Sequence, residues 1–241
     1  MNNDLDFLKN KIVLITGVTG AIGYDLAINL LKRNISVIGI CSGKRNKVKI
    51  NSLKKYKNFK ISYIDQSKLG LLEKHCQKIK KNYGCPEVIV NSAGIFKFKK
   101  LENNSISDIL YSFNINIISP ILITKFFIKF MSRKKTGTII NICSSSSYTG
   151  GGTYGHTIYT STKHALLGFS RALDEEFRSK NIRIGTVSPA GVKSNMTKNR
   201  KDISKNTLIS VKQVTDSIIF LIKERGNGII YEMRLWRKNR K

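Results

Sequence analysis

The chain has 241 residues, a hydrophobic fraction of 41% and four cysteines. This length is enough for one sizeable hydrophobic core, and the cysteines form no C-x-x-C pair that would indicate a zinc site or a disulfide framework. The N-terminal stretch carries early acids and lacks a secretory signal's apolar core. Residues 109–131 are apolar but interrupted by asparagines and lysines, so we expect no membrane span. The composition predicts a cytoplasmic protein without a metal site, folded as a single domain over residues 1–241.

The net charge of +28, from 43 Lys and Arg against 15 Asp and Glu, is the unusual feature of the composition. Such a balance can indicate a nucleic-acid or anionic membrane partner. The basic residues are spread along the chain, however, whereas blocks of charge mark interaction segments. We therefore predict no specific nucleic-acid partner. The closing cluster, RLWRKNRK over 234–241, is left open as a polyanion contact, a subunit contact or a solvated tail.

Short apolar runs alternate with longer segments of helical period, as in repeated βαβ units. The strand-like runs are residues 11–16, 36–41, 59–64, 87–91, 137–142 and 182–187, with a seventh candidate at 228–235. Apolar residues at helical spacing predict helices over 22–31, 67–82, 111–132, 158–179 and 210–224. Strands that are apolar on both faces belong in a parallel sheet covered on both sides. The expected fold is α/β, a Rossmann-type doubly wound parallel sheet of about seven strands with helices on both faces.

The stretch TGVTGAIG at 16–23 follows the first predicted strand and opens the first predicted helix. A strand that ends in a glycine turn before a helix presents free backbone N–H groups and a positive dipole end to an anion. A dinucleotide places its pyrophosphate at such a turn. A tight turn without a ligand is the alternative. Open α/β sheets bind ligands beyond the carboxyl ends of their strands, so the other strand ends are candidate positions too.

Chemically useful side chains follow several of these strands. The small-residue turn NSAG occupies 91–94, and Asp65 after the third strand is either a helix cap or a partner for a nucleotide base. Tyr159 and Lys163 are spaced i, i+4 and share a helix face. A fixed cation favours the phenolate and lowers the pKa of a tyrosine from its usual value near 10, toward the range useful for acid/base catalysis.

These motifs, in this order over residues 11–235, resemble those of the compact single-domain branch of the short-chain dehydrogenase/reductase family. TGVTGAIG resembles the family's cofactor turn, although Ala21 stands at the middle glycine and Gly20 lies one residue early. NSAG resembles the family's Asn-Asn-Ala-Gly, with Ser92 in place of an asparagine.

The resemblance also maps the active-site residues. INIISPILIT over 115–124 maps Asn116 onto the family's catalytic asparagine. A weaker alternative alignment places Asn114 at that position. GTIINICS places Ser144 at the active-site serine, and YTSTK supplies Tyr159 and Lys163. Ser144 lies fifteen residues before Tyr159, more than is usual in the family. Ser145 or Ser146 takes the role if this frame is wrong, and Ser146 and Ser147 are otherwise interpreted as loop residues.

The resemblance implies hydride transfer between a nicotinamide and a carbonyl/alcohol pair. Tyr159 would be the acid/base, Lys163 would support Tyr159 and hold the nicotinamide ribose, and Ser144 would hydrogen-bond the substrate oxygen. Asn116 would hold a water between Lys163 and solvent. The predicted cofactor-binding residues are Gly17, Thr19, Gly20, Ile22, Gly23, Ser42, Asp65, Asn91, Ala93, Gly94, Tyr159, Lys163, Pro189, Val192 and Ser194.

The end of the second strand favours NADP(H), with NAD(H) as the alternative. An acid there would hold a 2′-hydroxyl and repel a 2′-phosphate, but this end reads CSGKRNK, with Lys44 and Arg45 nearby. Ser42 is a predicted neighbour of the phosphate. The glycine turn itself lacks the arginine that NADP-preferring relatives often carry.

Several functions remain open at the level of sequence. An NADP-dependent carbonyl reductase or alcohol dehydrogenase for a small-molecule or carrier-bound carbonyl leads. The polar, basic loop at 194–209 hints at an anionic or carrier-bound substrate, and the general excess of lysine weakens that hint. A 3-oxoacyl-carrier-protein reductase is the specific alternative, although the chain's last residues lack the Val-Asp-Gly-Gly type of ending. A non-catalytic nucleotide- or RNA-binding Rossmann protein would not need the Ser, Tyr and Lys set. His156 lies before Tyr159, where it could touch substrate, and a homodimer or homotetramer through 111–132 and 158–179 is expected by analogy.

Overall fold

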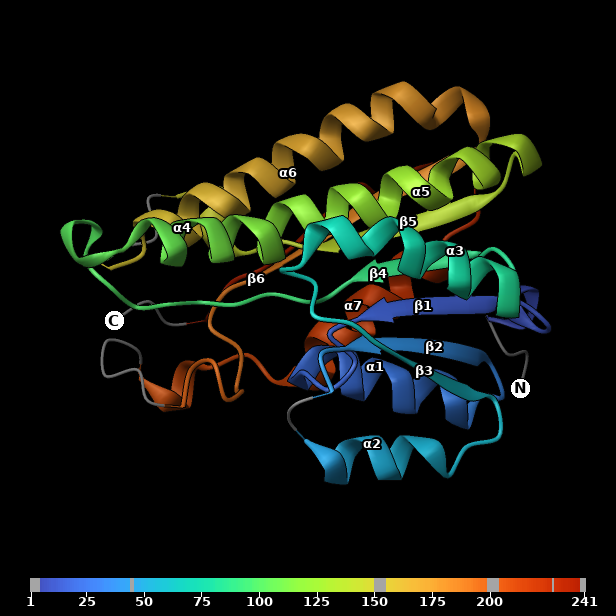
Figure 1. The fold of residues 1–241 in the computed structure, drawn as a ribbon, viewed down its shortest axis with the longest axis horizontal. Coiled ribbons are helices and arrows are strands. Elements are labelled where there is room, and N and C mark those ends of the chain that lie inside the picture. The colour runs from blue at the N-terminus through green and yellow to red at the C-terminus, as the bar shows by residue number, and fades with distance from the viewer. Residues whose placement is uncertain (1–4, 44–45, 150–154, 199–203, 227, 239–241) are drawn as a thin grey trace.

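The computed structural model describes residues 5–43, 46–149, 155–198, 204–226 and 228–238. Its centre is a parallel sheet of seven strands in the order β3-β2-β1-β4-β5-β6-β7 (Figure 1). The strands are β1 (Ile12–Thr16), β2 (Ser36–Cys41), β3 (Phe59–Tyr63), β4 (Val88–Asn91), β5 (Gly137–Ile142), β6 (Ile182–Pro189) and β7 (Glu232–Leu235).

Helices cover both faces of the sheet (Figure 1). They are α1 (Ala21–Lys32), α2 (Lys47–Lys54), α3 (Leu72–Tyr83), α4 (Ile106–Phe113), α5 (Ser119–Lys134), α6 (Thr157–Phe177) and α7 (Val211–Lys223). Helices α1 and α7 pack together on one face, and α3, α5 and α6 lie on the other, with α4 leading into α5. Short 3-10 turns occur at Asp6–Leu8, Leu69–Leu71, Leu101–Asn103, Ser145–Ser147, Arg178–Lys180 and Lys205–Thr207.

The central strand β1 shows why the sequence builds two helical layers. Val13 and Ile15 are fully buried in the core beneath α1 and α7, while Leu14 is fully buried in the core on the opposite face. A strand with apolar side chains on both faces is stable only where both faces are covered. The predicted doubly wound parallel sheet is thus confirmed.

The structure differs from the sequence prediction mainly in its helices. Helix α2 was not predicted, because Lys47–Lys54 is lysine-rich and buries only Ile50 and Leu53. The predicted helix 111–132 starts earlier, at α4, where the side chain of Ser105 accepts a hydrogen bond from the backbone N–H of Asp108. A π turn over Asn114–Ile118 then joins α4 to α5.

The continuous helical segment Ile106–Lys134 is long and apolar enough, by length and composition alone, to cross a membrane. In this fold its second half covers the sheet beside α3, and Ile123 and Phe127 are fully buried there. Part of its apolar surface therefore belongs to the core.

The order in which strands are added to the sheet reverses at β1, because β4 pairs in parallel with β1 on the side away from β2 and β3. Gly17, just after β1, has φ +63°, and a Cβ there would lie 2.8 Å from the Cα of Ala93, just after β4. The Thr16 hydroxyl accepts a hydrogen bond from the Ala93 N–H at 3.0 Å. Ligands bind at such a switch point in open α/β sheets.

Candidate active site

An open cavity of about 1270 Å³ lies at the carboxyl ends of the strands. It is lined by the predicted residues Gly17, Thr19, Gly20, Ile22, Ser42, Asp65, Ala93, Gly94, Ser144, Tyr159, Lys163, Pro189, Val192 and Ser194. The fold therefore brings residues from distant parts of the chain to one surface. Lys44 and Arg45, which the NADP(H) prediction used, lie outside the described residues.

The glycine turn forms one end of this cavity. The Gly20 N–H donates to the Gly17 carbonyl at 2.8 Å, and α1 begins at the next residue, Ala21. No side chain caps this end of α1, so the first N–H groups of the helix are available to an anion beside it. The turn can therefore receive an anionic group at the start of α1.

Two predicted cofactor contacts, Gly23 and Asn91, do not line the cavity. Gly23 is buried inside α1, and a Cβ there would lie 2.6 Å from the Gly17 carbonyl oxygen, so this glycine lets the helix pack against the turn. The Asn91 amide donates to the Asn141 Oδ1 at 2.8 Å within the core. Gly23 and Asn91 therefore stabilise the packing around the cavity and do not form part of its lining.

Asp65 lines the cavity and also organises its own loop. Its carboxylate accepts hydrogen bonds from the Ser67 backbone N–H at 3.1 Å and from the Ser67 hydroxyl at 2.7 Å. Asp65 is not a helix cap, because the N-cap residues of the 3-10 turn Leu69–Leu71 and of α3 are Lys68 and Leu71, and no side chain caps either end. Its place beside a nucleotide stays a prediction.

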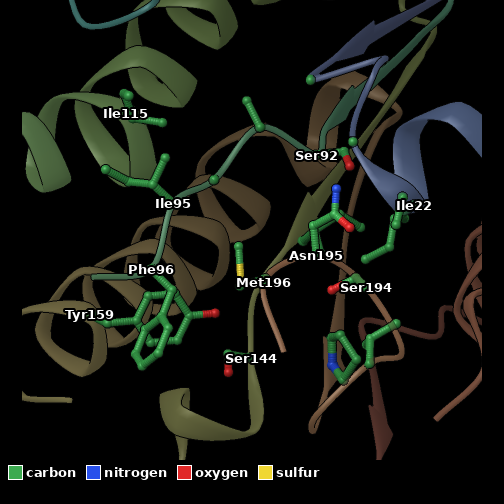
Figure 2. A pocket seen from close by; sticks show the side chains of 18 of the residues that line it. Ile22, Ser92, Ile95, Phe96, Ile115, Ser144, Tyr159, Ser194, Asn195 and Met196 are labelled. Atoms are coloured by element: carbon green, nitrogen blue, oxygen red, sulfur yellow. The ribbon is translucent and has the colours of Figure 1, made fainter. Parts of the chain in front are cut away.

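Tyr159 and Lys163 lie one turn apart in the first part of α6, and both line the cavity. The Lys163 Nζ is 5.8 Å from the centroid of the Tyr159 ring. Figure 2 shows the Tyr159 hydroxyl pointing into the cavity, on the side where Ser144 and Met196 lie. The Tyr159 phenol and the Lys163 ammonium are therefore both placed to act on a molecule bound in this cavity.

Lys163 is almost completely buried, with 4% of its surface exposed. Its Nζ donates to the Ile142 carbonyl at 2.7 Å, and no carboxylate among the described residues pairs with it. Burial lowers the pKa of its ammonium, because a charge is poorly solvated in the interior. A buried cation without a carboxylate is costly for stability, which is typical of a functional group.

Ser144 lines the cavity two residues after the end of β5. Its Oγ accepts a hydrogen bond from the Ser146 N–H at 3.1 Å, which leaves its own proton for another acceptor. The Ser147 hydroxyl instead donates to the Lys163 backbone carbonyl at 2.9 Å and so supports α6. Ser145 and Ser146 also line the cavity, so the alternatives are near in space.

Asn116 is fully buried in the π turn and does not line the cavity. Its Oδ1 accepts from the Ile95 N–H at 2.8 Å, while its Nδ2 donates to the Ile95 carbonyl and to the Thr162 hydroxyl, both at 3.0 Å. The side chain thus ties the segment after β4 to α6. Asn114 is directed elsewhere, since its amide donates to the Ser67 carbonyl at 3.3 Å.

An aromatic wall borders Tyr159; it contains His156, which the sequence singles out, and two phenylalanines that carry no sequence signal. The Phe96 ring lies 5.0 Å from the Tyr159 ring and 5.0 Å from the His156 ring, measured between centroids. Phe98 packs edge-on against His156. His156 is buried and lines the cavity, as does Met196. This end of the cavity suits an apolar substrate.

Two further basic side chains, Lys49 and Arg237, also reach the cavity. Lys49, on the unpredicted helix α2, lines it beside the glycine turn. Trp236 and Arg237 line it from the segment after β7, and an Arg237 Nη donates to the Thr207 hydroxyl at 3.2 Å. Only the folded chain brings these residues to the site. Among the described residues, no three His, Cys, Asp or Glu side chains gather in a way that could hold a metal ion.

Comparison with known proteins agrees with this geometry. The family model described as short chain dehydrogenase matches residues 11–204. The 3-oxoacyl-acyl-carrier-protein reductase of Buchnera aphidicola subsp. Schizaphis graminum is 29% identical over 92% of this chain and 93% of its own length. The same enzyme of Chlamydia trachomatis is 31% identical over 83% of this chain and 81% of its own. Carbonyl reductase family member 4 of Xenopus laevis is 32% identical over 66% of this chain and 69% of its own.

Solved structures share the fold. The NADP-bound structure of ElxO superposes with a TM-score of 0.81 at 26% identity, covering 93% of this chain and 96% of that one. 4-Hydroxyisoleucine dehydrogenase with NADH superposes with a TM-score of 0.83 at 21% identity, over the same shares. The chain belongs to the short-chain dehydrogenase/reductase family and is an oxidoreductase.

Proposed function

We propose that this protein transfers a hydride between NADP(H) and a carbonyl/alcohol pair, with Tyr159 as the general acid/base. The observation that carries this proposal is Lys163, a buried cation without a carboxylate partner, one helical turn from a tyrosine that faces the cavity. A lysine is expected to bear the cost of burial only where its charge has a use.

The residues present fit a dinucleotide. The turn through Gly17, Gly20 and the start of α1 would hold the pyrophosphate. Lys163 and Tyr159 would hold the nicotinamide ribose, and Pro189, Val192 and Ser194 would line the carboxamide side. When bound, the nicotinamide supplies or accepts the hydride. The protein's task is to orient the substrate and to manage the proton.

In the reducing direction, the Tyr159 hydroxyl gives its proton to the substrate oxygen as that oxygen gains negative charge. Ser144 donates a second hydrogen bond to the same oxygen, because its Oγ already accepts from Ser146 and its proton is available. The Lys163 ammonium stabilises the phenolate that remains. Both amide N–H groups of Asn116 are engaged, by the Ile95 carbonyl and the Thr162 hydroxyl, and its Oδ1 accepts one hydrogen bond from Ile95, which leaves one lone pair for a water.

The substrate proposed for this site is a carbonyl compound with an apolar substituent, because Phe96 and Met196 border the Tyr159 hydroxyl (Figure 2). An acyl group on a carrier protein is the specific form that we favour. It is supported by the relatives named as 3-oxoacyl-acyl-carrier-protein reductases. It is also supported by Arg237, a cation of the cavity lining that pairs with no carboxylate among the described residues.

A homodimer or homotetramer is part of the proposal. Ile106 and Leu110 on α4 are 77% and 56% exposed, beside α6. Apolar side chains exposed together, here one turn apart on the same helix, are typical of an interface. Size-exclusion chromatography with light scattering would measure the mass, and a monomer at micromolar concentration would contradict this part of the proposal.

The proposed reaction is tested by following the oxidation of NADPH with a panel that contains a 3-oxoacyl thioester, its carrier-protein form and simple ketones. We expect turnover of at least the thioester, and lower KM for the carrier-bound form. An absence of dinucleotide oxidation across the panel, with no reverse reaction on the matching alcohols, would contradict the proposal.

A further inference from the structure

Lys49 projects from α2 to the glycine turn, about thirty residues away in sequence. Its Nζ donates to the Thr19 carbonyl at 3.2 Å, and the side chain lines the same cavity as Thr19 and Gly20. The ammonium is thereby held against the turn at which the proposed dinucleotide would bind. Lys49 takes no part in the proposed proton and hydride transfer.

The Lys49 ammonium has N–H donors left over and a positive charge that an anion could pair with. An ammonium has three N–H donors, and only the Thr19 carbonyl accepts from Lys49 in the described part of the chain. No described carboxylate neutralises it, and partial burial lowers the pKa of Lys49. A dianionic group beside it would supply both an acceptor and a countercharge.

The neighbourhood of Lys49 suits a phosphate. Ser42 and Asn46, which line the same cavity, provide a hydroxyl and an amide after β2. Asp65 is the one carboxylate among the described lining residues, and it already accepts two hydrogen bonds from Ser67. The end of β2 is where a dinucleotide presents the 2′-position of its adenosine ribose.

We propose that Lys49 binds the 2′-phosphate of NADP(H), with Ser42 as a neighbouring hydrogen-bond donor, and that it sets the preference for NADP(H) over NAD(H). This proposal rests on the proposed function. In this proposal, helix α2 places a lysine ammonium beside the glycine turn, whose own residues, TGVTGAIG, include no lysine or arginine.

Tyr24 on α1 positions Lys49. The Lys49 Nζ lies 4.8 Å from the centroid of the Tyr24 ring, a cation–π distance. The Tyr24 hydroxyl is hydrogen-bonded to the Ser52 hydroxyl at 2.7 Å, and Ser52 in turn donates to the Lys49 carbonyl at 2.9 Å. The contact between α1 and α2 thus fixes the side chain before any ligand arrives.

The test measures binding without turnover. Calorimetry with 2′,5′-ADP and with 5′-ADP would be run on the wild type, Lys49→Gln, Lys49→Arg and the control Lys54→Gln, which removes an exposed lysine of the same helix. We expect the wild type to bind 2′,5′-ADP at least tenfold more tightly than 5′-ADP. Lys49→Gln should lose most of this ratio with unchanged affinity for 5′-ADP, whereas Lys49→Arg and Lys54→Gln should keep it.

The outcomes separate the two proposals. A wild type with no preference for 2′,5′-ADP, or a Lys49→Gln variant that keeps the full preference, would overturn the role of Lys49 and leave the proposed reaction standing with whichever dinucleotide binds. Failure of NADPH and NADH alike to bind the wild type would instead contradict the proposed function. Thermal unfolding of each variant shows whether it is folded, and the 5′-ADP affinity is the internal control.

Discussion

The Lys163 ammonium donates a hydrogen bond to the backbone carbonyl of Ile142, 2.7 Å away at the end of β5. Ser144 follows Ile142 by two residues, so the strand that holds the lysine also presents the serine. Gly94 also lies close to this ammonium, since a Cβ there would be 3.6 Å from the Lys163 Nζ, an ordinary van der Waals contact. The proposed catalytic groups are therefore held together by the contact between β5 and α6.

Replacing Lys163 by methionine should abolish turnover but not the fold. Burial lowers the pKa of Lys163, so the unfolded chain binds this proton more tightly than the folded chain does. The resulting destabilisation is complete below the folded-state pKa and is relieved as the pH rises toward 10.5, the lysine's ordinary pKa. Lys163→Met should be as stable as the wild type, or more so, at pH 7, and should lose this advantage as the pH rises. Urea unfolding at several pH values measures it, and a difference independent of pH would contradict it.

Ser144→Ala should lower kcat by about 10²-fold to 10³-fold, as expected when one donor to a developing oxyanion is lost. The matched control is Ser145→Ala, which removes a neighbouring hydroxyl of the same cavity lining and should change kcat by less than about threefold. Steady-state kinetics on one substrate compares the two. If Ser145→Ala lowers kcat more than Ser144→Ala does, Ser145 rather than Ser144 is the active-site serine.

Gly23→Ala should disturb the glycine turn, because the added Cβ would lie 2.6 Å from the Gly17 carbonyl oxygen. We expect a loss of about 1–3 kcal/mol in the free energy of unfolding, together with weaker dinucleotide binding. Gly168→Ala, on the exposed side of α6 with no heavy atom within 4 Å of the new Cβ, is the control. It should leave stability unchanged or raise it by up to about 1 kcal/mol. Equal stability of both variants would refute the close packing at Gly23.

Glu232 on β7 should stabilise the fold in a pH-dependent way. The hydrogen bond from Arg171, aided by those from Tyr148 and Arg234, lowers the pKa of Glu232 to about 2. This stabilisation is present above the ordinary value of 4.5 and is lost as the pH falls toward 2. Because Arg171 is half exposed, we expect Glu232→Gln to cost only about 2 kcal/mol at pH 7.

Chemical denaturation at pH 7 and near pH 2.5 measures the effect of Glu232→Gln. The cost should shrink at the lower pH. Glu102→Gln is the control, since that carboxylate is 66% exposed and 3.8 Å from its lysine, and it should have almost no effect. A cost for Glu232→Gln that stays constant over this pH range would contradict the assignment.

The sheet could be predicted from sequence because its strands are apolar on both faces, and this pattern depends only on local residues. Strand ends differ by a few residues: β7 begins at Glu232 rather than 228, and β6 extends to Pro189. Helix α2 was missed because it buries few apolar residues and begins after Asn46, which has φ +65°. The Ser105 cap of α4 was visible in the sequence, as a serine three residues before Asp108.

Candidate residues could be named from sequence where the signal is local: Ser144 follows a strand by two residues, and Tyr159 shares a helix face with Lys163. The remaining contacts arise from packing between distant segments. Lys49 reaches Thr19 only because α2 packs on α1, and the Asn116 amide meets Ile95 only through the π turn. No local pattern of residues carries that information.

The most direct measurement of the central claim is the rate of deuteride transfer from 4-deuterated NADPH to a 3-oxoacyl thioester by the wild type and by Tyr159→Phe. Loss of the phenolic proton donor should lower the rate by about 10²-fold to 10⁴-fold. NADPH affinity should change by less than about tenfold, since the ring of the phenylalanine remains and Lys163 keeps its bond to Ile142. A Tyr159→Phe enzyme that transfers deuteride at the wild-type rate would contradict the account.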